Sequence, residues 1–190
     1  EPQIANGLEA AIRRLVKAGV RIVEHPLPEL DEIHALAWDP KGSRLVAEAY
    51  AQWGGMLAEN EQLIYRPVFE RVMAGERLSA GDIIRADLKR REIAAHYLAA
   101  TAGVDAVIMP TVAIAPPPIA ELEPGGEPYG RANRMALRNT TIGNQLGLCA
   151  ITLPCGRDDN GLPIGLMLQS PPHTEEKLLS LARGMELVLH

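Results

Sequence analysis

The chain has 190 residues, 47% of them hydrophobic and 23% charged, with a formal net charge of −5. This size and balance are typical of an ordinary soluble domain with one hydrophobic core. The acidic balance argues against nucleic-acid or anionic-membrane partners, which bind concentrated lysine and arginine, and no apolar run is long enough to span a membrane.

The cysteines indicate a reducing compartment. There are two, Cys149 and Cys155, both in apolar surroundings. On one strand they would point to the same face but lie too far apart to form a disulfide. We therefore expect reduced structural thiols and a cytoplasmic protein. The opening EPQIANGLEAAI has neither an initiator Met nor a signal-peptide pattern, so we expect a fragment or a processed chain.

The first part of the chain predicts a helix, a strand and a second helix. Apolar residues recur at helical spacing over Ile4–Val16, and Gly19 closes the run. Val20–Val23 then reads as a short strand. Asp31 is the expected N-cap of a helix that ends at Trp38.

The middle of the chain predicts three more helices. Ser43 is the expected N-cap of the first. Its inner face would comprise Val46, Ala49, Tyr50, Trp53, Met56 and Leu57. A short helix over Val68–Ala74 follows, and then Ser79 and Asp82 resemble a capping box that opens a helix running to about Ala102. The inward stripe of that long helix would comprise Ile84, Leu88, Ala95 and Leu98.

The next segments predict a buried strand, a long loop and a helix. Val104–Met109 is apolar nearly throughout, which is typical of a strand buried on both faces. Val112–Tyr129 is rich in Pro and Gly and predicts a loop. Loops of that length are usually functional or mobile, so we expect this loop to set substrate specificity. Asn133 is the expected cap of a helix leading towards Gly147.

The last segments predict a buried hairpin and a closing helix. The apolar strands Cys149–Cys155 and Pro163–Gln169 are joined by a turn at 159–161. Thr174 would cap the final helix, whose inward residues would be Leu178, Leu181, Met185 and Val188. With four strands, most of them apolar, we predict one α/β unit over residues 1–190. Its mixed β-sheet would be covered by helices on both faces.

Most catalytic patterns are absent from the sequence. Neither GxxxxGK[ST] nor GxGxxG occurs, and without CxxC, HExxH or another close His/Cys set we expect no metal and no cofactor. None of the four serines stands in GxSxG. Cys155 lies at a strand end but has Arg157 rather than a histidine beside it, which favours a structural thiol. We therefore assign no catalytic residue.

The run NTTIGNQLGLCAITLPCGRDDNGLPIGLMLQS, from Asn139, contains an Asn-Thr pair, an N-x-x-G pattern, an apolar strand ending in P-x-G, and G-L-P-x-G. With the closing HTEEKLLSLARGME, it resembles the C-terminal part of the amidase signature family. Upstream, Ala47–Ala49 is similar to the family's A-E-A helix and Asp105–Thr111 to its D-x-h-h-x-P-T strand, where h is apolar. The chain departs from the family at Gln145, where Leu is usual, and at Leu148–Ala150, where Leu-Pro-Ala is common.

The resemblance implies the fold of the C-terminal portion of an amidase, acting on a small-molecule amide. The family hydrolyses amide C–N bonds with a Ser–cis-Ser–Lys arrangement carried by a Gly/Ser-rich N-terminal half. No such stretch occurs in this chain. The resemblance therefore places the catalytic residues outside it and makes the missing N-terminal half of the same protein its expected partner. We expect the chain alone to be inactive.

The resemblance also implies a few substrate-binding residues. Trp53 would line the acyl pocket, Thr111, Asn139 and Thr140 would stand in the cleft wall, and Gln145 would belong to its polar rim. Each also has a structural interpretation: Trp53 fits a helical core stripe, and Asn139 and Thr140 could satisfy loop backbone.

Two other functions stay open. One is the amidase-like subunit of a glutamine-dependent aminoacyl-tRNA amidotransferase, although the acidic residue expected near Asn139 for glutamine is not visible. The other is a non-catalytic α/β scaffold fragment. If a missing half leaves a sheet edge exposed, the chain is also expected to self-pair as a homodimer.

Overall fold

The computed structural model describes residues 1–123 and 126–189. In chain order the elements are α1 (Pro2–Lys17), α2 (Glu29–Trp38), α3 (Arg44–Glu59), η1 (Glu61–Leu63), α4 (Arg66–Met73), η2 (Ala74–Arg77), α5 (Ala80–Ala100), β1 (Val107–Pro110), α6 (Ile119–Leu122), α7 (Gly126–Leu146), β2 (Cys149–Arg157), β3 (Pro163–Ser170) and α8 (Glu175–Leu189), where η marks a short 3-10 helix. None of the helices in these residues has the length and apolar character needed to cross a membrane.

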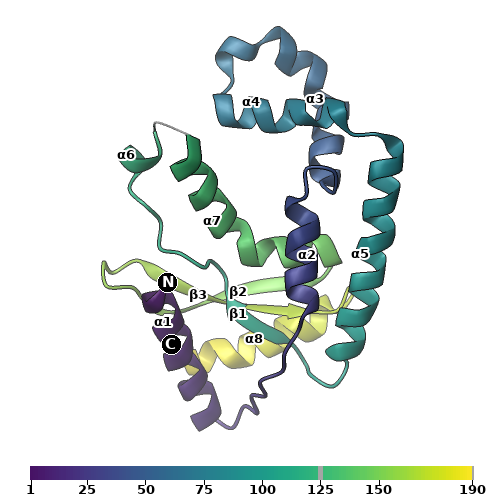
Figure 1. Ribbon diagram of the computed structural model, residues 1–190. Coiled ribbons are helices and arrows are strands. Elements are labelled where there is room, and N and C mark those ends of the chain that lie inside the picture. The colour runs from purple at the N-terminus through teal and green to yellow at the C-terminus, as the bar shows by residue number, and fades with distance from the viewer. Residues whose placement is uncertain (124–125, 190) are drawn as a thin grey trace.

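The sheet is small, and its central strand is the last one in the chain. The strand order is β1-β3-β2, and both pairings are antiparallel. The predicted hairpin is therefore confirmed as β2 and β3, with β3 in the middle and β2 at the edge (Figure 1). Within the described residues the sheet has three antiparallel strands, where we expected four strands in a mixed sheet.

The fourth expected strand, Val20–Val23, is wrong. The segment after α1 runs without regular structure until α2 begins, and Val23 is 58% exposed. Its β-branched residues favour extended backbone. However, none of the strands in the described residues pairs with it, and an isolated extended segment is not a strand.

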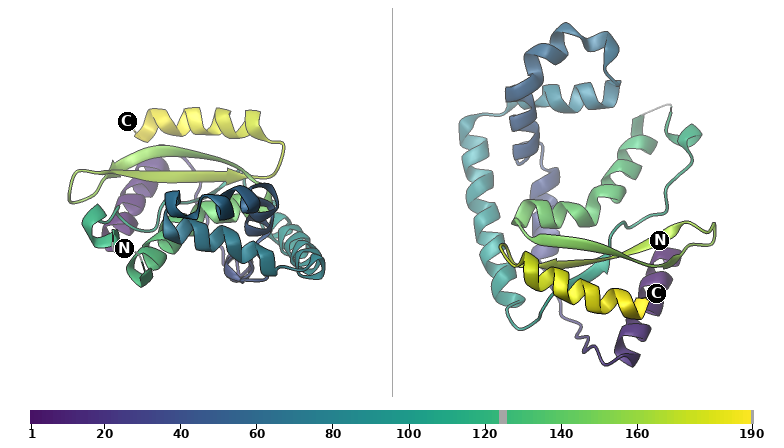
Figure 2. Two further views of the ribbon diagram at one scale, coloured as in Figure 1. Left: turned by 90° about the horizontal axis from the view of Figure 1, so that it is seen from above. Right: turned by 180° about the vertical axis from the view of Figure 1, so that it is seen from behind.

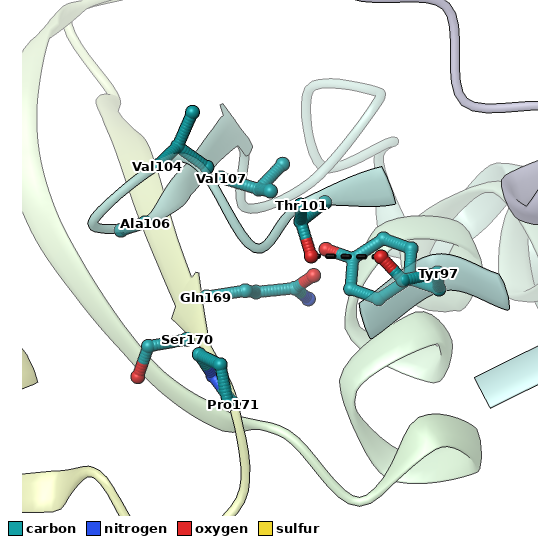
Figure 3. Close-up of a pocket in the computed structure, with 8 residues that line it drawn as sticks. All are labelled: Tyr97, Thr101, Val104, Ala106, Val107, Gln169, Ser170 and Pro171. Atoms are coloured by element: carbon teal, nitrogen blue, oxygen red, sulfur yellow. Dashed lines mark hydrogen bonds between the residues drawn. The ribbon is translucent and has the colours of Figure 1, made fainter. Parts of the chain in front are cut away.

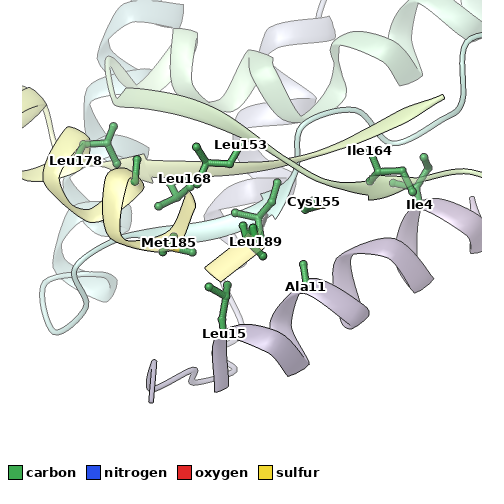
Figure 4. Close-up of a cluster of buried hydrophobic side chains, with 12 residues drawn as sticks. Ile4, Ala11, Leu15, Leu153, Cys155, Ile164, Leu168, Leu178, Met185 and Leu189 are labelled. Atoms are coloured by element: carbon green, nitrogen blue, oxygen red, sulfur yellow. The ribbon is translucent and has the colours of Figure 1, made fainter. Parts of the chain in front are cut away.

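Helices cover both faces of the sheet, which confirms the α/β fold class. A first core joins α1 and α8 to one face (Figure 4); its buried residues are Ile4, Ala11, Leu15, Leu153, Cys155, Ile164, Leu166, Leu168, Leu178, Ala182, Met185 and Leu189. A second core joins α2, α5 and α7; its buried residues are Ile33, Ile93, Tyr97, Ile142 and Leu146. Val107 and Met109 of β1 pack against this second core, while Ala106 and Ile108 pack against the first. The sheet therefore lies between two helical layers (Figures 1 and 2).

Helix starts follow local signals in some places and not in others. The Ser43 cap is confirmed, because its side chain accepts a hydrogen bond from the Val46 N–H. The Ser79–Asp82 capping box is confirmed in both directions. The prediction for α2 is wrong, since this helix begins at Glu29, ahead of Asp31.

The predicted inner face of α5 is largely wrong, and that of α3 is partly right. Ile84 and Leu88 are 60% and 62% exposed, and α5 instead buries Ala86, Ile93 and Tyr97. On α3, Trp53 and Met56 are 52% and 55% exposed, while the other predicted residues are half-buried or buried: Val46, Ala49, Tyr50 and Leu57. Periodicity marks apolar positions, but it does not show which of them the neighbouring helices cover. In Figure 1, α3 and α4 form an arm that projects away from the sheet.

The long loop is shorter than predicted. Within Val112–Tyr129 the chain forms α6 and the first residues of α7, and residues 124–125 lie outside the described part. Asn133 is thus an interior residue of α7 and not its cap, which is a second wrong helix start. Asn139 and Thr140 lie inside α7, so the alternative in which they satisfy loop backbone is wrong.

Arg14 ties three elements of the first core together. Its guanidinium on α1 donates one hydrogen bond to the Leu189 carbonyl at the end of α8, at 3.0 Å, and another to the Cys155 carbonyl in β2. Hydrogen bonds from a charged donor are about twice as strong as neutral ones. Arg14 therefore links the N-terminal helix, the edge strand and the C-terminal helix.

We predict that Arg14→Ala lowers the free energy of unfolding by about 2–3 kcal/mol, because it removes two charge-assisted hydrogen bonds. The matched control is Arg13→Ala on the same helix. Arg13 is exposed and makes only a 3.7 Å ion pair with Glu9, so this control should change stability by less than about 0.5 kcal/mol. Urea unfolding of both variants measures the difference, and equal effects would contradict the assignment.

Candidate functional site

Part of one face of β2 is not covered by either helical layer. Cys149, Ile151, Leu153 and Cys155 turn towards the first core. On the other face Thr152 and Pro154 are exposed, and beyond Pro154 a register shift places Gly156 opposite Ile164 of the first core. We call Thr152, Pro154 and the adjoining part of β3 around Gly165 the open face. On this side α7 covers the other end of β3, where Gly143 lies against Gln169.

Two threonine hydroxyls meet on the open face. Thr111 follows β1, and its N–H donates to the Gly165 carbonyl at 2.8 Å, which continues the pairing of β1 with β3. Its Oγ1 lies 3.0 Å from Oγ1 of Thr152 in β2. The two outer strands therefore bring their hydroxyls together across the central strand. We call Thr111 and Thr152 the hydroxyl pair.

Gly165 is what permits this approach. A Cβ at this position would lie 2.6 Å from Thr111 Oγ1 and 2.7 Å from Thr152 Cγ2. Both separations are far below van der Waals contact, so only glycine fits beneath the hydroxyl pair. The sequence signal for this position was the G-L-P-x-G pattern, in which Gly165 is the second glycine.

Asn139 holds α7 against the same corner of the sheet. Its Nδ2 donates to the Pro110 carbonyl at 2.6 Å, next to Thr111. Since Pro110 is the last residue of β1, this bond fixes the helix relative to the strand end that carries Thr111. The structure thus brings Thr111 and Asn139 together.

The other predicted site residues lie elsewhere. Thr140 donates to the Leu137 carbonyl of its own helix at 3.2 Å. Gln145 Oε1 accepts a 2.9 Å hydrogen bond from Arg90 Nε on α5, so it joins two helices. Trp53 is on α3, which packs against α4, η2 and α5 and not against the sheet. Thr152 was not anticipated, because its pairing with Thr111 depends on the strand register.

The hydroxyl pair is uncharged, and its chemistry is limited accordingly. Two neighbouring hydroxyls can donate to a carbonyl and accept from an N–H, which suits a neutral amide group. Within the described residues no ionisable side chain is hydrogen bonded to either hydroxyl, so neither has a base to activate it. The same part of the chain brings together no set of three His, Cys, Asp or Glu side chains that could hold a metal ion.

Cys155 lies on the opposite face of β2 from the hydroxyl pair. Its side chain is 2% exposed in the first core, and burial raises the pKa of the thiol although the nearby Arg14 lowers it. A thiol with a raised pKa stays protonated at neutral pH and is a poor nucleophile. This environment supports the structural interpretation.

We predict that Gly165→Ala lowers the free energy of unfolding by about 1–3 kcal/mol, since the added methyl group forces Thr111 and Thr152 apart. Gly184→Ala in α8 is the control, because a Cβ there meets nothing within 4 Å and alanine favours helix by up to about 1 kcal/mol. Thermal or urea unfolding distinguishes the two. A neutral Gly165→Ala would contradict the close packing described above.

Comparison with curated proteins finds relatives that are considerably longer. The chain is 33% identical over 189 residues to a 2-amino-5-chloromuconic acid deaminase of Comamonas testosteroni, covering 100% of this chain and 40% of that protein. It is 31% identical to a fatty acid amide hydrolase of Arabidopsis thaliana, covering 88% and 27%. It is 30% identical to a glutamyl-tRNA(Gln) amidotransferase subunit of Desulfatibacillum aliphaticivorans, covering 97% and 41%. The chain therefore spans less than half the length of these relatives.

Solved structures agree on the fold. An allophanate hydrolase of Kluyveromyces lactis superimposes with a TM-score of 0.86 at 24% identity, covering 100% of this chain and 30% of that one. A 6-aminohexanoate cyclic dimer hydrolase gives a TM-score of 0.79 at 23% identity, covering 100% and 42%. The Amidase family model matches residues 1–179. This match and the relatives that align along the whole chain show that the chain belongs to the amidase family.

Proposed function

We propose that residues 1–190 are one α/β unit, the C-terminal part of an amidase that hydrolyses amide C–N bonds of a small molecule. The catalysis would follow the Ser–cis-Ser–Lys mechanism, with catalytic residues outside this chain. The observation that carries the proposal is the hydroxyl pair on an open sheet face, in a family member that spans 40% of its relative's length.

The open face is suited to contact with another part of a larger protein. Thr152 and Pro154 are exposed although they belong to a strand whose other side is in the core. The outer edge of β2 is also unpaired among the described strands. Such a surface supports the missing N-terminal half as the partner, because a sheet edge and an uncovered face both favour further packing.

Each site residue receives a role in this proposal. Thr111 and Thr152 form a polar wall that hydrogen-bonds the substrate amide, and Asn139 positions α7 beside it. Gln145 holds α7 against α5 through Arg90. Trp53, with half of its surface exposed on the arm, lines the acyl pocket once the N-terminal half is in place.

Thr140 is proposed at the cleft rim on α7, where its hydroxyl donates a solvent-exposed hydrogen bond to the Leu137 carbonyl of the same helix.

Two free cysteines, Cys149 and Cys155, support a reducing cytoplasmic compartment.

The similarity to an amidotransferase keeps that function as the second candidate. A requirement for glutamine as ammonia donor would favour it over a simple amidase.

The test compares the 190-residue chain with the same chain extended by the Gly/Ser-rich segment of its own reading frame. We expect the extended protein to hydrolyse simple amides and to be blocked by a serine-directed inhibitor, while the chain alone is inactive because it lacks a nucleophile. Thr111→Val in the extended protein should lower kcat/KM about tenfold, since one hydrogen bond to the substrate is lost. Arg13→Ala serves as the surface control.

Two outcomes would contradict the proposal. One is inhibitor-sensitive amide hydrolysis by the 190-residue chain alone, which would place a nucleophile within it. The other is an extended protein that folds but hydrolyses no amide, which would favour the scaffold function.

We also propose that the isolated chain forms a homodimer through its uncovered surface, since an unpaired strand edge favours self-association. Size-exclusion chromatography with light scattering measures the mass. We expect the isolated chain to have twice its 20.6 kDa chain mass, and the N-terminally extended protein to have the mass of a single extended chain. A monomeric isolated chain would contradict this proposal.

A further inference from the structure

A small cavity lies where α5 ends and where β1 meets β3. Its volume is about 10 Å³, and it is lined by Tyr97, Thr101, Val104, Ala106, Val107, Gln169, Ser170 and Pro171 (Figure 3). It is remote from the hydroxyl pair, because Gln169 lies at the end of β3 that α7 covers. A space of this size corresponds to about one water molecule.

Two buried polar side chains at this cavity each leave one oxygen atom unpaired within the described part of the chain. Tyr97 and Gln169 are 2% and 1% exposed. Neither the Tyr97 hydroxyl nor Gln169 Oε1 has a hydrogen-bond partner among the described residues. In Figure 3 the amide end of Gln169 points towards Tyr97. An unsatisfied buried polar group costs about 1–3 kcal/mol, so two such groups around one cavity indicate that they share a partner.

We propose that this cavity is a binding site for a single water molecule that bridges Tyr97 and Gln169. The Tyr97 hydroxyl donates to the water oxygen, and the water donates one hydrogen to Gln169 Oε1. Its second hydrogen goes to Thr101 Oγ1. That oxygen already donates to the Tyr97 carbonyl at 2.8 Å and keeps its lone pairs for accepting. Three polar partners are the usual number for a buried water.

The protonation state of the tyrosine fits this role. Burial, and secondly the negative charge of Glu29, raise the pKa of Tyr97 from 10.0 to about 12. The phenol therefore keeps its proton, and can donate it in a hydrogen bond, throughout the physiological range. Gln169 carries no charge, so the bridge buries no ion.

The water would join the helical layer to the central strand. Tyr97 belongs to α5 and Gln169 to β3. The Gln169 amide also lies over α7, where a Cβ at Gly143 would be 3.3 Å from Nε2. Three elements thus meet around Gln169, and the bridge orients the second core on the sheet by hydrogen bonds as well as by apolar packing.

The test is a double-mutant cycle of Tyr97→Phe and Gln169→Met in the 190-residue chain, measured by urea unfolding. Each change keeps the side-chain shape and removes one partner of the water. We expect each single variant to lower the folding equilibrium constant about tenfold, and the double variant also about tenfold, because the shared water is lost only once. A hundredfold loss in the double variant would overturn the proposal.

A control and a second measurement complete the test. Tyr50→Phe, on the arm, should show no coupling with Gln169→Met.

A high-resolution crystal structure of the unmodified chain gives a readout that does not depend on whether the variants fold. We expect one water within hydrogen-bond distance of both Tyr97 Oη and Gln169 Oε1. A direct bond between these two atoms, or a cavity closed by a side chain, would overturn the proposal.

Discussion

The structure depends on one strand, β3, which is packed on both edges and on both faces. It pairs with β1 on one side and β2 on the other. Leu166 and Leu168 are fully buried in the first core, and Met167 and Gln169 are buried on the opposite face. A strand in this position determines where every neighbour lies, because its two edges set the register and its two faces set the helical layers.

The candidate site is a consequence of the same strand. Gly165 leaves room for Thr111 and Thr152 to meet, and one residue further the strand returns to buried leucine. Asn139 then holds α7 beside the hydroxyl pair through the Pro110 carbonyl. The result is a neutral, hydrogen-bonding surface on a rigid sheet. Under the proposed function such a surface orients an amide, while the nucleophile comes from another part of the protein.

Local signals in the sequence were sufficient for the features that depend on few residues. The hairpin, the Ser43 cap and the Ser79–Asp82 capping box need only neighbouring residues, and all three were predictable. The family resemblance was predictable too, because its motifs lie in this hairpin. Thr111 and Asn139 were singled out from it as candidate residues, and the structure places Asn139 against the Pro110 carbonyl next to Thr111.

The failures concern properties that only the tertiary structure decides. Periodicity shows that α5 and α3 have apolar positions, but not which of them a neighbour covers, and so Ile84 and Trp53 were placed inside. Val20–Val23 has strand composition without a partner strand. Thr152 and the cavity at Gln169 depend on strand register and on the packing of α5, neither of which leaves a pattern in the sequence.

We propose that the open face and outer edge of β2 are completed by another part of the same protein. Hydrogen exchange of the β2 amides tests this directly, in the 190-residue chain diluted to its monomeric form and in the N-terminally extended protein. We expect the outward-facing amides of β2 to exchange much more slowly in the extended protein than in the monomeric chain, while those of β3 are protected in both. Equal, rapid exchange of the β2 edge in the two proteins would contradict it.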